Sequence, residues 1–183
     1  MSQQFASLSD QLINFIKEQK IFFVGTATND SRVNISPKGM DSFRVTSKNS
    51  VVWLNVTGSG NETSAHVQVN PRMTIMFTAF EGKPLILRLY GSAKVIHKND
   101  IEWESLYCLF KPTTGARQIF ELEIDMVQTS CGMSVPLLDY VEDRQLLSKW
   151  ADTKDENDIK KYWLDNNQLS IDGIATNIAA KND

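Results

Sequence analysis

Residues 51–66 read VVWLNVTGSGNETSAH, and this stretch decides the fold. Its first part, residues 51–56, is a short apolar run of the kind that forms a buried β-strand. Glycines and hydroxyl side chains follow, and residues 61–70 then predict a short helix that ends just before Pro71. Backbone amides at the start of a helix have no partner within the helix and favour anions. The stretch therefore predicts a strand, a polar turn and a helix start that can hold a phosphate.

A second polar segment, residues 32–38, precedes this stretch and is predicted to be a strand. Successive side chains alternate between the two faces of a strand, so Asn34, Ser36 and Lys38 share one face. On the functional interpretation, the Lys38 ammonium neutralises a phosphate dianion while Asn34 and Ser36 donate hydrogen bonds. On the alternative interpretation, Lys38 is a solvated lysine at the end of a strand.

The polar turn offers hydrogen-bond donors of its own from Ser59, Asn61 and Thr63. A helix start favours negative charge, so these donors would suit an anion. The alternative is an ordinary helix N-cap, which Asn61 or Thr63 could supply, and Glu62 suits the helix dipole without any ligand. Either segment alone is a weak signal, but the turn and Lys38 together predict a cradle for a phosphorylated ligand.

The rest of the chain predicts strands in hairpin order with helices at the ends. About six strands lie too close together in sequence for crossover helices, which favours an antiparallel barrel over a parallel α/β sheet. Ser9 can cap a first helix that ends near Lys20. The expected strands are residues 21–28, 33–37, 51–56, 73–80, 84–96 and 117–127, with a short addition at 43–45. The later helices are expected at residues 101–110, 138–150 and 155–167, followed by a polar tail.

Length and composition bound the kind of protein. The chain has 183 residues, 42% of them apolar and 22% charged, so we expect one domain with a sizeable core over residues 1–183. A net charge of −3 argues against non-specific nucleic-acid binding, which needs a basic surface. No apolar run approaches the ~18 residues of a membrane helix, and the start lacks the pattern of a secretory signal. Two cysteines do not make a disulfide framework, so the expected location is the cytoplasm.

The order of these motifs resembles the split-barrel flavoproteins related to pyridoxamine 5'-phosphate oxidase, over roughly residues 5–127. The resemblance implies a mainly β fold: a six-stranded antiparallel split barrel of the FMN-binding type, with peripheral helices. Residues 137–183 would form a helical C-terminal extension of the same domain. The pieces that carry the resemblance are residues 21–28, 32–38 and 51–56, the polar turn, the helix ending in Asn70-Pro71, and residues 73–80.

The resemblance also implies a cofactor, FMN, bound non-covalently at the interface of a homodimer. In this family the strand that matches residues 32–38 touches the flavin and its phosphate. Asn55 and Val56 match positions along the isoalloxazine ring, and the turn at residues 59–63 completes the phosphate site. The residues expected to bind FMN are therefore Arg32, Asn34, Ser36, Lys38, Asn55, Val56, Ser59, Asn61 and Thr63.

The chain departs from the oxidases in two places. The oxidases carry an adjacent arginine and lysine at the helix start, where this chain has Glu62-Thr63. The phosphate charge would then rest on Lys38, with Arg32 or an arginine of a partner subunit. The oxidases also end in a basic, histidine-bearing motif that grips the substrate phosphate, whereas the histidines here, His66 and His97, both lie upstream. We therefore expect an uncharacterised branch of the family rather than a true pyridoxamine phosphate oxidase.

The leading functional hypothesis is an FMN-dependent oxidoreductase that transfers hydride or electrons between FMN and a small-molecule substrate. The alternatives are a non-catalytic flavin or haem carrier of the same fold, or a protein that binds a deazaflavin. Deazaflavins carry longer acidic tails and generally need a more basic groove than this acidic chain offers. No acid, base or nucleophile stands out, so the sequence predicts no catalytic residue.

Other reactive side chains have two interpretations each. Glu62 and His66 stand four residues apart on one helix face and could offer two metal ligands, but no third ligand is visible, so we expect a surface pair and no metal site. Cys131 lies in a loop that could bring a redox-active thiol to the flavin edge, although a small buried hydrophobe is the commoner role of a lone cysteine. Arg88 could reach a substrate anion or make an ion pair.

Overall fold

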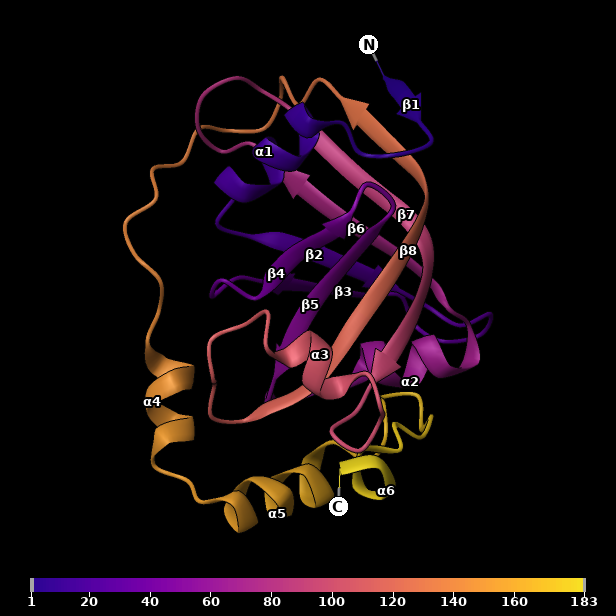
Figure 1. Ribbon diagram of the computed structural model, residues 1–183, viewed down its shortest axis with the longest axis vertical. Coiled ribbons are helices and arrows are strands. Elements are labelled where there is room, and N and C mark those ends of the chain that lie inside the picture. Colours follow the sequence, from indigo (N-terminus) through magenta and orange to yellow (C-terminus); the bar gives the residue numbers. More distant parts are fainter. Residues whose placement is uncertain (1, 183) are drawn as a thin grey trace.

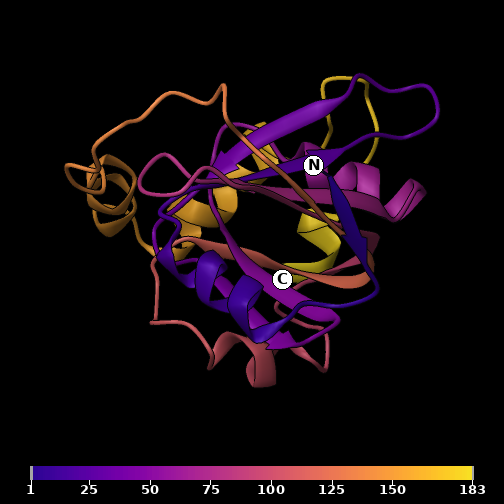
Figure 2. The same cartoon turned by 90° about the horizontal axis from the view of Figure 1, so that it is seen from above.

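The sheet is antiparallel throughout and curls into a half-open barrel (Figures 1 and 2). A computed structural model describes residues 2–182. Its strands are β1 (Gln3–Phe5), β2 (Phe22–Thr26), β3 (Asn34–Lys38), β4 (Phe43–Ser47), β5 (Ser50–Val56), β6 (Arg72–Thr78), β7 (Ile86–Ile96) and β8 (Ala116–Ser130). They pair in the order β3-β2-β6-β7-β8-β5-β4, with β1 added beside β8.

The barrel is open between β3 and β4, which end this path on either side and do not pair with each other. The predicted mainly β antiparallel split barrel is therefore confirmed. The strand count of six was too low, since the described residues form an eight-stranded sheet. Short edge strands account for the difference, because β1 has only three residues and β4 only five, too few for a clear alternating pattern.

The helices lie at the two ends of the barrel (Figure 1). They are α1 (Asp10–Glu18), α2 (Glu62–Val69), α3 (Trp103–Tyr107), α4 (Leu146–Asp152), α5 (Glu156–Asn166) and α6 (Ile178–Asn182). The first helix begins where the sequence predicts, since the Ser9 hydroxyl accepts a hydrogen bond from the Leu12 amide at 3.3 Å. Within residues 2–182, every helix is too short or too polar to cross a membrane.

Aromatic side chains fill the centre of the barrel. Trp53 and Phe120 stack with ring centroids 4.5 Å apart, and Phe43 meets Phe77 edge-on at 5.1 Å. Such pairs contribute beyond their buried area. Around them pack the buried aliphatic side chains of β2, β5, β6, β7 and β8. This apolar core fixes the register of the strands, because a slip by one residue would turn each apolar face outward.

One glycine allows β7 and β8 to cross closely at an irregularity in their register. The pairing shifts between Tyr90 and Gly91, where a β-bulge bends the long strand. A Cβ atom at Gly91 would collide with the carbonyl group of Glu123. Only glycine fits this crossing without moving the backbone.

Two expectations about the second half of the chain were wrong. The helix expected at residues 138–150 begins only at Leu146, and the preceding segment is irregular, with Leu137 and Val141 largely exposed. The apolar stripe of this segment has no surface to pack against, so a helix gains nothing from burial there. The helix expected at residues 101–110 is also shorter, covering Trp103–Tyr107.

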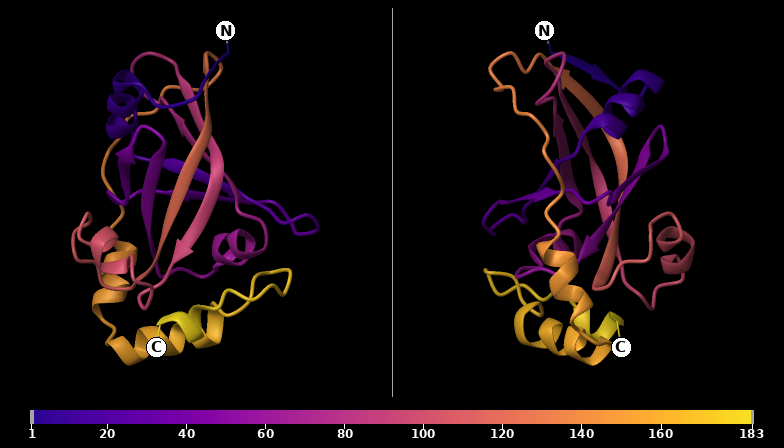
Figure 3. Two further views of the ribbon diagram at one scale, coloured as in Figure 1. Left: turned by 45° about the vertical axis from the view of Figure 1, so that its right-hand side comes forward. Right: turned by 90° about the vertical axis from the view of Figure 1, so that its left-hand side faces the viewer.

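The expected polar tail is instead a folded segment. Residues 169 and 175 form an isolated β-bridge, and the segment then continues into α6. Thr176 and Ile178 are completely buried, and the Asn182 amide lies 3.1 Å from Nδ1 of His97 at the end of β7. From two sides, Figure 3 shows α5, α6 and their connecting loop under the end of the barrel that carries α2.

Candidate functional site

The inward face of β3 carries three of the side chains that the sequence singles out. Lys38, Ser36 and Asn34 pair in register with Phe22, Val24 and Thr26 of β2, whose side chains are buried in the barrel. The Asn34 amide donates to the Ser36 hydroxyl at 3.1 Å and to the Thr63 hydroxyl at 3.3 Å. The structure thus brings Asn34, at the start of β3, against the first turn of α2, while Lys38 lies at the other end of the strand opposite Phe22.

Lys38 is a half-buried cation without an acid partner, and the solvated lysine of the alternative interpretation was wrong. Its Nζ lies 5.1 Å from the centroid of the Trp53 ring. Among the described residues, no hydrogen-bond acceptor or carboxylate pairs with it. Burial, and secondarily the charge of Arg117, lowers the pKa of Lys38 from 10.5 to about 8.

Arg117 is the main functional candidate that sequence reasoning missed. The pairing of β5 with β8 shifts between Asn55 and Val56, and Arg117 is the extra residue of that bulge. A bulge re-aims the side chain it carries. The guanidinium is buried, and its Nη1 donates to the Asn167 carboxamide oxygen at 2.7 Å while its Nη2 donates to the Gly60 carbonyl at 3.1 Å. Burial lowers its pKa to about 10, and within residues 2–182 no carboxylate pairs with it.

One sequence signal could have identified Arg117, namely the apolar residues that follow it in the strand. An arginine beside the apolar residues 119 and 120 at the start of a strand must either reach solvent or find buried acceptors. The sequence does not show the bulge that turns this side chain toward the polar turn.

In the polar turn before α2, the backbone carbonyl groups accept hydrogen bonds, whereas some hydrogen-bond donors have no acceptor. The Asn167 amide donates to the carbonyls of Gly58 and Ser59 at 3.0 and 3.4 Å, and Arg117 takes the carbonyl of Gly60. Asn61 is 3% exposed, yet neither its amide nitrogen nor its carbonyl oxygen has a hydrogen-bond partner. It stands at the N-cap position of α2 without forming the capping bond, so the ordinary cap interpretation was wrong for this residue. The Ser59 side chain is exposed.

A buried hydrogen-bond network joins β5, β8 and α2 behind the turn. The Asn55 amide donates to the Gln118 carbonyl oxygen at 3.2 Å, and the Gln118 amide donates to the Ser64 hydroxyl at 3.0 Å. The Ser64 hydroxyl in turn donates to the backbone carbonyl of Thr176 at 3.2 Å. Asn55 therefore fixes the strand against the helix.

A cavity of about 560 Å³ opens beside Lys38. Lys38, Asn55 and Val56 line it, together with residues 110–114 and parts of the segment 143–152. Its volume falls in the range that holds small ligands and cofactors, roughly 300–1,000 Å³. Three of the sequence-predicted residues thus share one cavity, while Asn34, Ser36 and Thr63 form the adjoining polar group.

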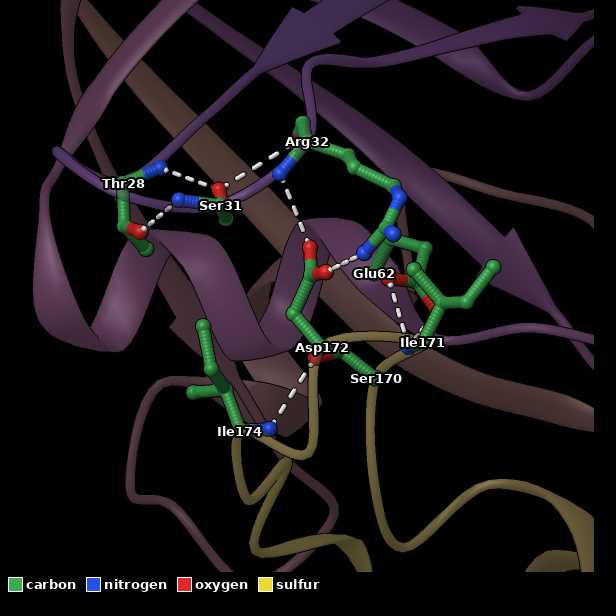
Figure 4. A network of polar contacts seen from close by, with 8 residues as sticks. All are labelled: Thr28, Ser31, Arg32, Glu62, Ser170, Ile171, Asp172 and Ile174. Carbon is green, nitrogen blue, oxygen red and sulfur yellow. Dashed lines mark hydrogen bonds and ion pairs between the residues drawn. The ribbon is translucent and has the colours of Figure 1, made fainter.

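Arg32 and Glu62 are both engaged by the loop that follows α5 (Figure 4). Arg32 forms an ion pair with Asp172, and its backbone N–H donates to the same carboxylate at 2.8 Å. These contacts hold the pKa of Asp172 below its usual range. The Glu62 carboxylate accepts from the backbone N–H of Ile171 at 3.1 Å. The structure therefore does not bring the Arg32 side chain together with Lys38, and Glu62 turns its charge toward this loop.

The expected surface pair of Glu62 and His66 is not found. His66 is buried, and its Nδ1 lies 3.1 Å from the Thr26 hydroxyl, whereas Glu62 faces the loop after α5. Across residues 2–182, no group of three histidine, cysteine, aspartate or glutamate side chains could hold a metal ion.

Cys131 and Arg88 lie away from the cavity. Cys131 is exposed, so its expected role as a small buried hydrophobe was wrong. It follows the end of β8 opposite to Arg117, and the loop packs Gly132 against residues 85 and 86 instead of reaching the cavity. Arg88 donates to the Ser130 hydroxyl at 3.2 Å and makes no ion pair within the described part of the chain.

The geometry defines an antiparallel split barrel with a cationic, hydrogen-bonding site at one end. Comparison with known sequences assigns the family: residues 8–131 match the sequence model described as pyridoxamine 5'-phosphate oxidase, and the chain belongs to that family. A relative from Aspergillus flavus, the pyridoxamine 5'-phosphate oxidase family protein ustO, is 37% identical over 188 residues, covering 93% of this chain and 76% of the relative.

Solved structures share the fold at low identity. HupZ from Group A Streptococcus superposes with a TM-score of 0.54 at 17% identity, over 65% of this chain and 91% of HupZ. A pyridoxamine 5'-phosphate oxidase-related, FMN-binding protein from Nostoc punctiforme superposes with a TM-score of 0.51 at 14% identity, over 68% of this chain and 85% of that protein. The family match ends at residue 131, so the C-terminal helices lie outside it.

Proposed function

We propose that this protein binds FMN non-covalently at the polar end of the barrel and acts as an FMN-dependent oxidoreductase on a small substrate. Family membership supports the proposal, and a relative in fold from Nostoc punctiforme is described as FMN-binding. The observation that carries it is electrostatic. Lys38 and Arg117 are cations in the barrel wall, burial lowers the pKa of both, and the charge of Arg117 lowers that of Lys38 further. Neither has a carboxylate partner among the described residues. A phosphate dianion would neutralise this excess charge.

The residues present fit the cofactor. Lys38 is free to contact an anion directly, while Arg117, whose Nη atoms are bonded to Asn167 and Gly60, contributes positive potential from behind the turn. The unpartnered amide of Asn61 is a further donor, because leaving it unsatisfied costs roughly 1–3 kcal/mol. The adjoining cavity of about 560 Å³ is lined in part by Val56 and offers room for a ring system.

In this proposal the chain's own residues bind and orient the cofactor. Lys38 holds the phosphate. Ser36 and Asn34, on the same face of β3, bound the phosphate position on the side of that strand. The walls of the cavity exclude water from one side of the ligand. FMN, when bound, supplies the hydride or electron transfer. Positive charge at this end stabilises an added negative charge nearby, which favours reduction. The cavity lining contains no histidine or cysteine, and its acidic side chains are Asp41, Asp143 and Asp152, to which no catalytic role is assigned.

A homodimer with the cofactor near its interface is part of the proposal. Val33, just before β3, and Ile35, on the outer face of β3, are 71% and 68% exposed. A groove of about 540 Å³ continues from them along β2, β6 and β7. Exposed apolar surface of this kind is typical of an interface. Light scattering should give twice the chain mass of 20.7 kDa, and a single-chain mass would contradict the dimer.

The test begins with the absorption spectrum of the purified protein and a fluorescence titration with FMN. We expect a flavin spectrum that a hydride donor or another reductant bleaches. A sample that binds FMN but reacts with no donor would instead support a flavin carrier, a Soret band would indicate haem, and a protein that takes up neither would refute the proposal.

Lys38→Ala is the decisive variant. Loss of a charge-assisted phosphate contact, about 1.5–3 kcal/mol, lowers FMN affinity about ten- to a hundredfold. Lys48→Ala is the matched control, because Lys48 is an exposed lysine in the turn at the opposite end of β5. Equal FMN affinity in Lys38→Ala and the unmodified protein would show that the phosphate does not bind at Lys38.

A further inference from the structure

We infer that the C-terminal extension is a working part of the phosphate site, with Asn167 as the residue that positions the turn at residues 58–61. The inference rests on the proposed FMN site and adds to it a segment that the family match does not cover. It concerns the contacts that hold the turn in place and their effect on the preference for a ligand that carries a phosphate.

Asn167 connects the turn to the buried guanidinium. It follows the end of α5 and is completely buried. Its carboxamide oxygen accepts from Arg117 at 2.7 Å, while its amide nitrogen donates to the carbonyls of Gly58 and Ser59. With the bond from Arg117 to Gly60, three successive carbonyl groups of the turn point toward this pair.

The direction of these carbonyl groups decides where the turn's amides point. In a trans peptide unit, the C=O of one residue and the N–H of the next point in opposite directions. No peptide bond in the described chain is cis. The N–H groups of Ser59 and Gly60 therefore point away from Asn167, and that of Asn61 points away from Arg117. Within residues 2–182 none of the three has an acceptor. Successive amides turned to one side form an anion-binding concavity.

Two further contacts from the extension hold the turn on either side. Before the turn, the Trp163 indole N–H donates to the Thr57 hydroxyl at 2.8 Å, and both side chains are buried. After the turn, the Thr176 carbonyl accepts from the Ser64 hydroxyl at 3.2 Å and from the Gln68 amide at 3.0 Å. The Thr176 hydroxyl donates to the Asn167 backbone carbonyl at 2.6 Å, which joins the two contacts into one support.

These contacts from the extension should strengthen binding of the phosphate group and leave binding of the flavin ring unchanged. FMN and riboflavin share the ring and the ribityl chain and differ only in the phosphate. If the extension orders the amides that face the phosphate, releasing it should reduce the preference for FMN over riboflavin. A merely structural role would weaken both ligands alike.

The experiment measures the dissociation constants of FMN and riboflavin for Asn167→Ala in the full chain. We expect FMN affinity to fall about tenfold or more, because the anchored turn is lost, with riboflavin affinity unchanged. Asn166→Ala is the control: this neighbour is exposed, and its side chain bonds only to the Tyr162 carbonyl of its own helix. An equal loss for both ligands, or no loss for either, would overturn the inference.

Trp163→Phe keeps the inference falsifiable if Asn167→Ala does not fold. It retains a buried aromatic ring, although a smaller one, and removes the indole N–H that reaches Thr57. We expect a smaller drop in the FMN-to-riboflavin preference, and an unchanged preference would count against the inference. Unmodified protein that binds neither ligand would refute the proposed function itself. Unmodified protein that binds both equally would leave flavin binding intact and refute the positioning role.

Discussion

The two ends of the barrel bury their side chains for different reasons. Toward one end and into the centre, Phe43 meets Phe22 and Phe77 edge-on, and Phe22 and Phe77 lie tilted against each other with ring centroids 5.7 Å apart. At the other, Gln118 and Arg117 are just as buried but are surrounded by carbonyl and amide groups. Burying apolar surface stabilises the fold directly, whereas burying polar groups costs free energy unless each finds a partner.

Both regions contain buried side-chain atoms without a hydrogen-bond partner. In the aromatic region these are the indole nitrogen of Trp53 and the Thr78 hydroxyl, and at the polar end they are the Asn61 carboxamide and Nε of Arg117. At the polar end the unpaired groups include an amide and a cation, which an anion can satisfy. The aromatic end should therefore govern the free energy of unfolding, and the polar end should govern affinity for the ligand.

The largest expected effect is on the aromatic end. Phe77→Ala removes a ring that is 2% exposed and contacts both Phe22 and Phe43, so the free energy of unfolding should fall by about 3–5 kcal/mol. Urea denaturation measures this loss. Ile101→Ala, at a side chain 95% exposed, is the control and should change stability by less than about 0.5 kcal/mol. A Phe77→Ala protein as stable as the control would contradict the claim that the aromatic side chains govern the free energy of unfolding.

The next effect is a pH dependence at Lys38, which pairs with Phe22 of the aromatic region and whose charge interacts with Arg117 of the polar end. The pKa of Lys38 is about 8 in the folded protein and 10.5 ordinarily. Between these values the unfolded chain binds more protons, so stability of the ligand-free protein should rise with pH. FMN affinity should fall over the same rise, because the phosphate binds the protonated amine.

Titrations with FMN at pH 7 and pH 9 measure this second effect, and thermal unfolding of the ligand-free protein follows the opposite trend. Lys38→Met should bind FMN weakly with little pH dependence between these values. Equal pH dependence in Lys38→Met and in the unmodified protein would assign the titration to another group.

The smallest effect is expected at Cys131, which follows the end of β8 away from the cavity. Cys131→Ser should leave stability, FMN content and turnover unchanged, since the side chain is exposed and lines no part of the cavity. Loss of turnover with FMN retained would show that this thiol takes part in the chemistry.

Local sequence patterns predicted much of this architecture. The apolar run before the polar turn became β5, the Ser9 cap began α1, and alternation put Asn34, Ser36 and Lys38 on one face of β3. These predictions succeed because each depends on neighbours only a few residues apart. The helix expected at residues 138–150 failed because its formation depends on a packing surface elsewhere in the chain.

By itself, the sequence determined the antiparallel barrel, the polar turn before α2 and the face of β3 that carries Lys38. Only the tertiary structure decided that Arg117 turns inward at a bulge, that Asp172 engages Arg32, and that Asn167 lies under the turn. The physical reason is separation along the sequence. Hydrophobic periodicity depends on residues close together in the chain, whereas these contacts join residues 50 to 140 positions apart. Such contacts exist only after the chain has closed.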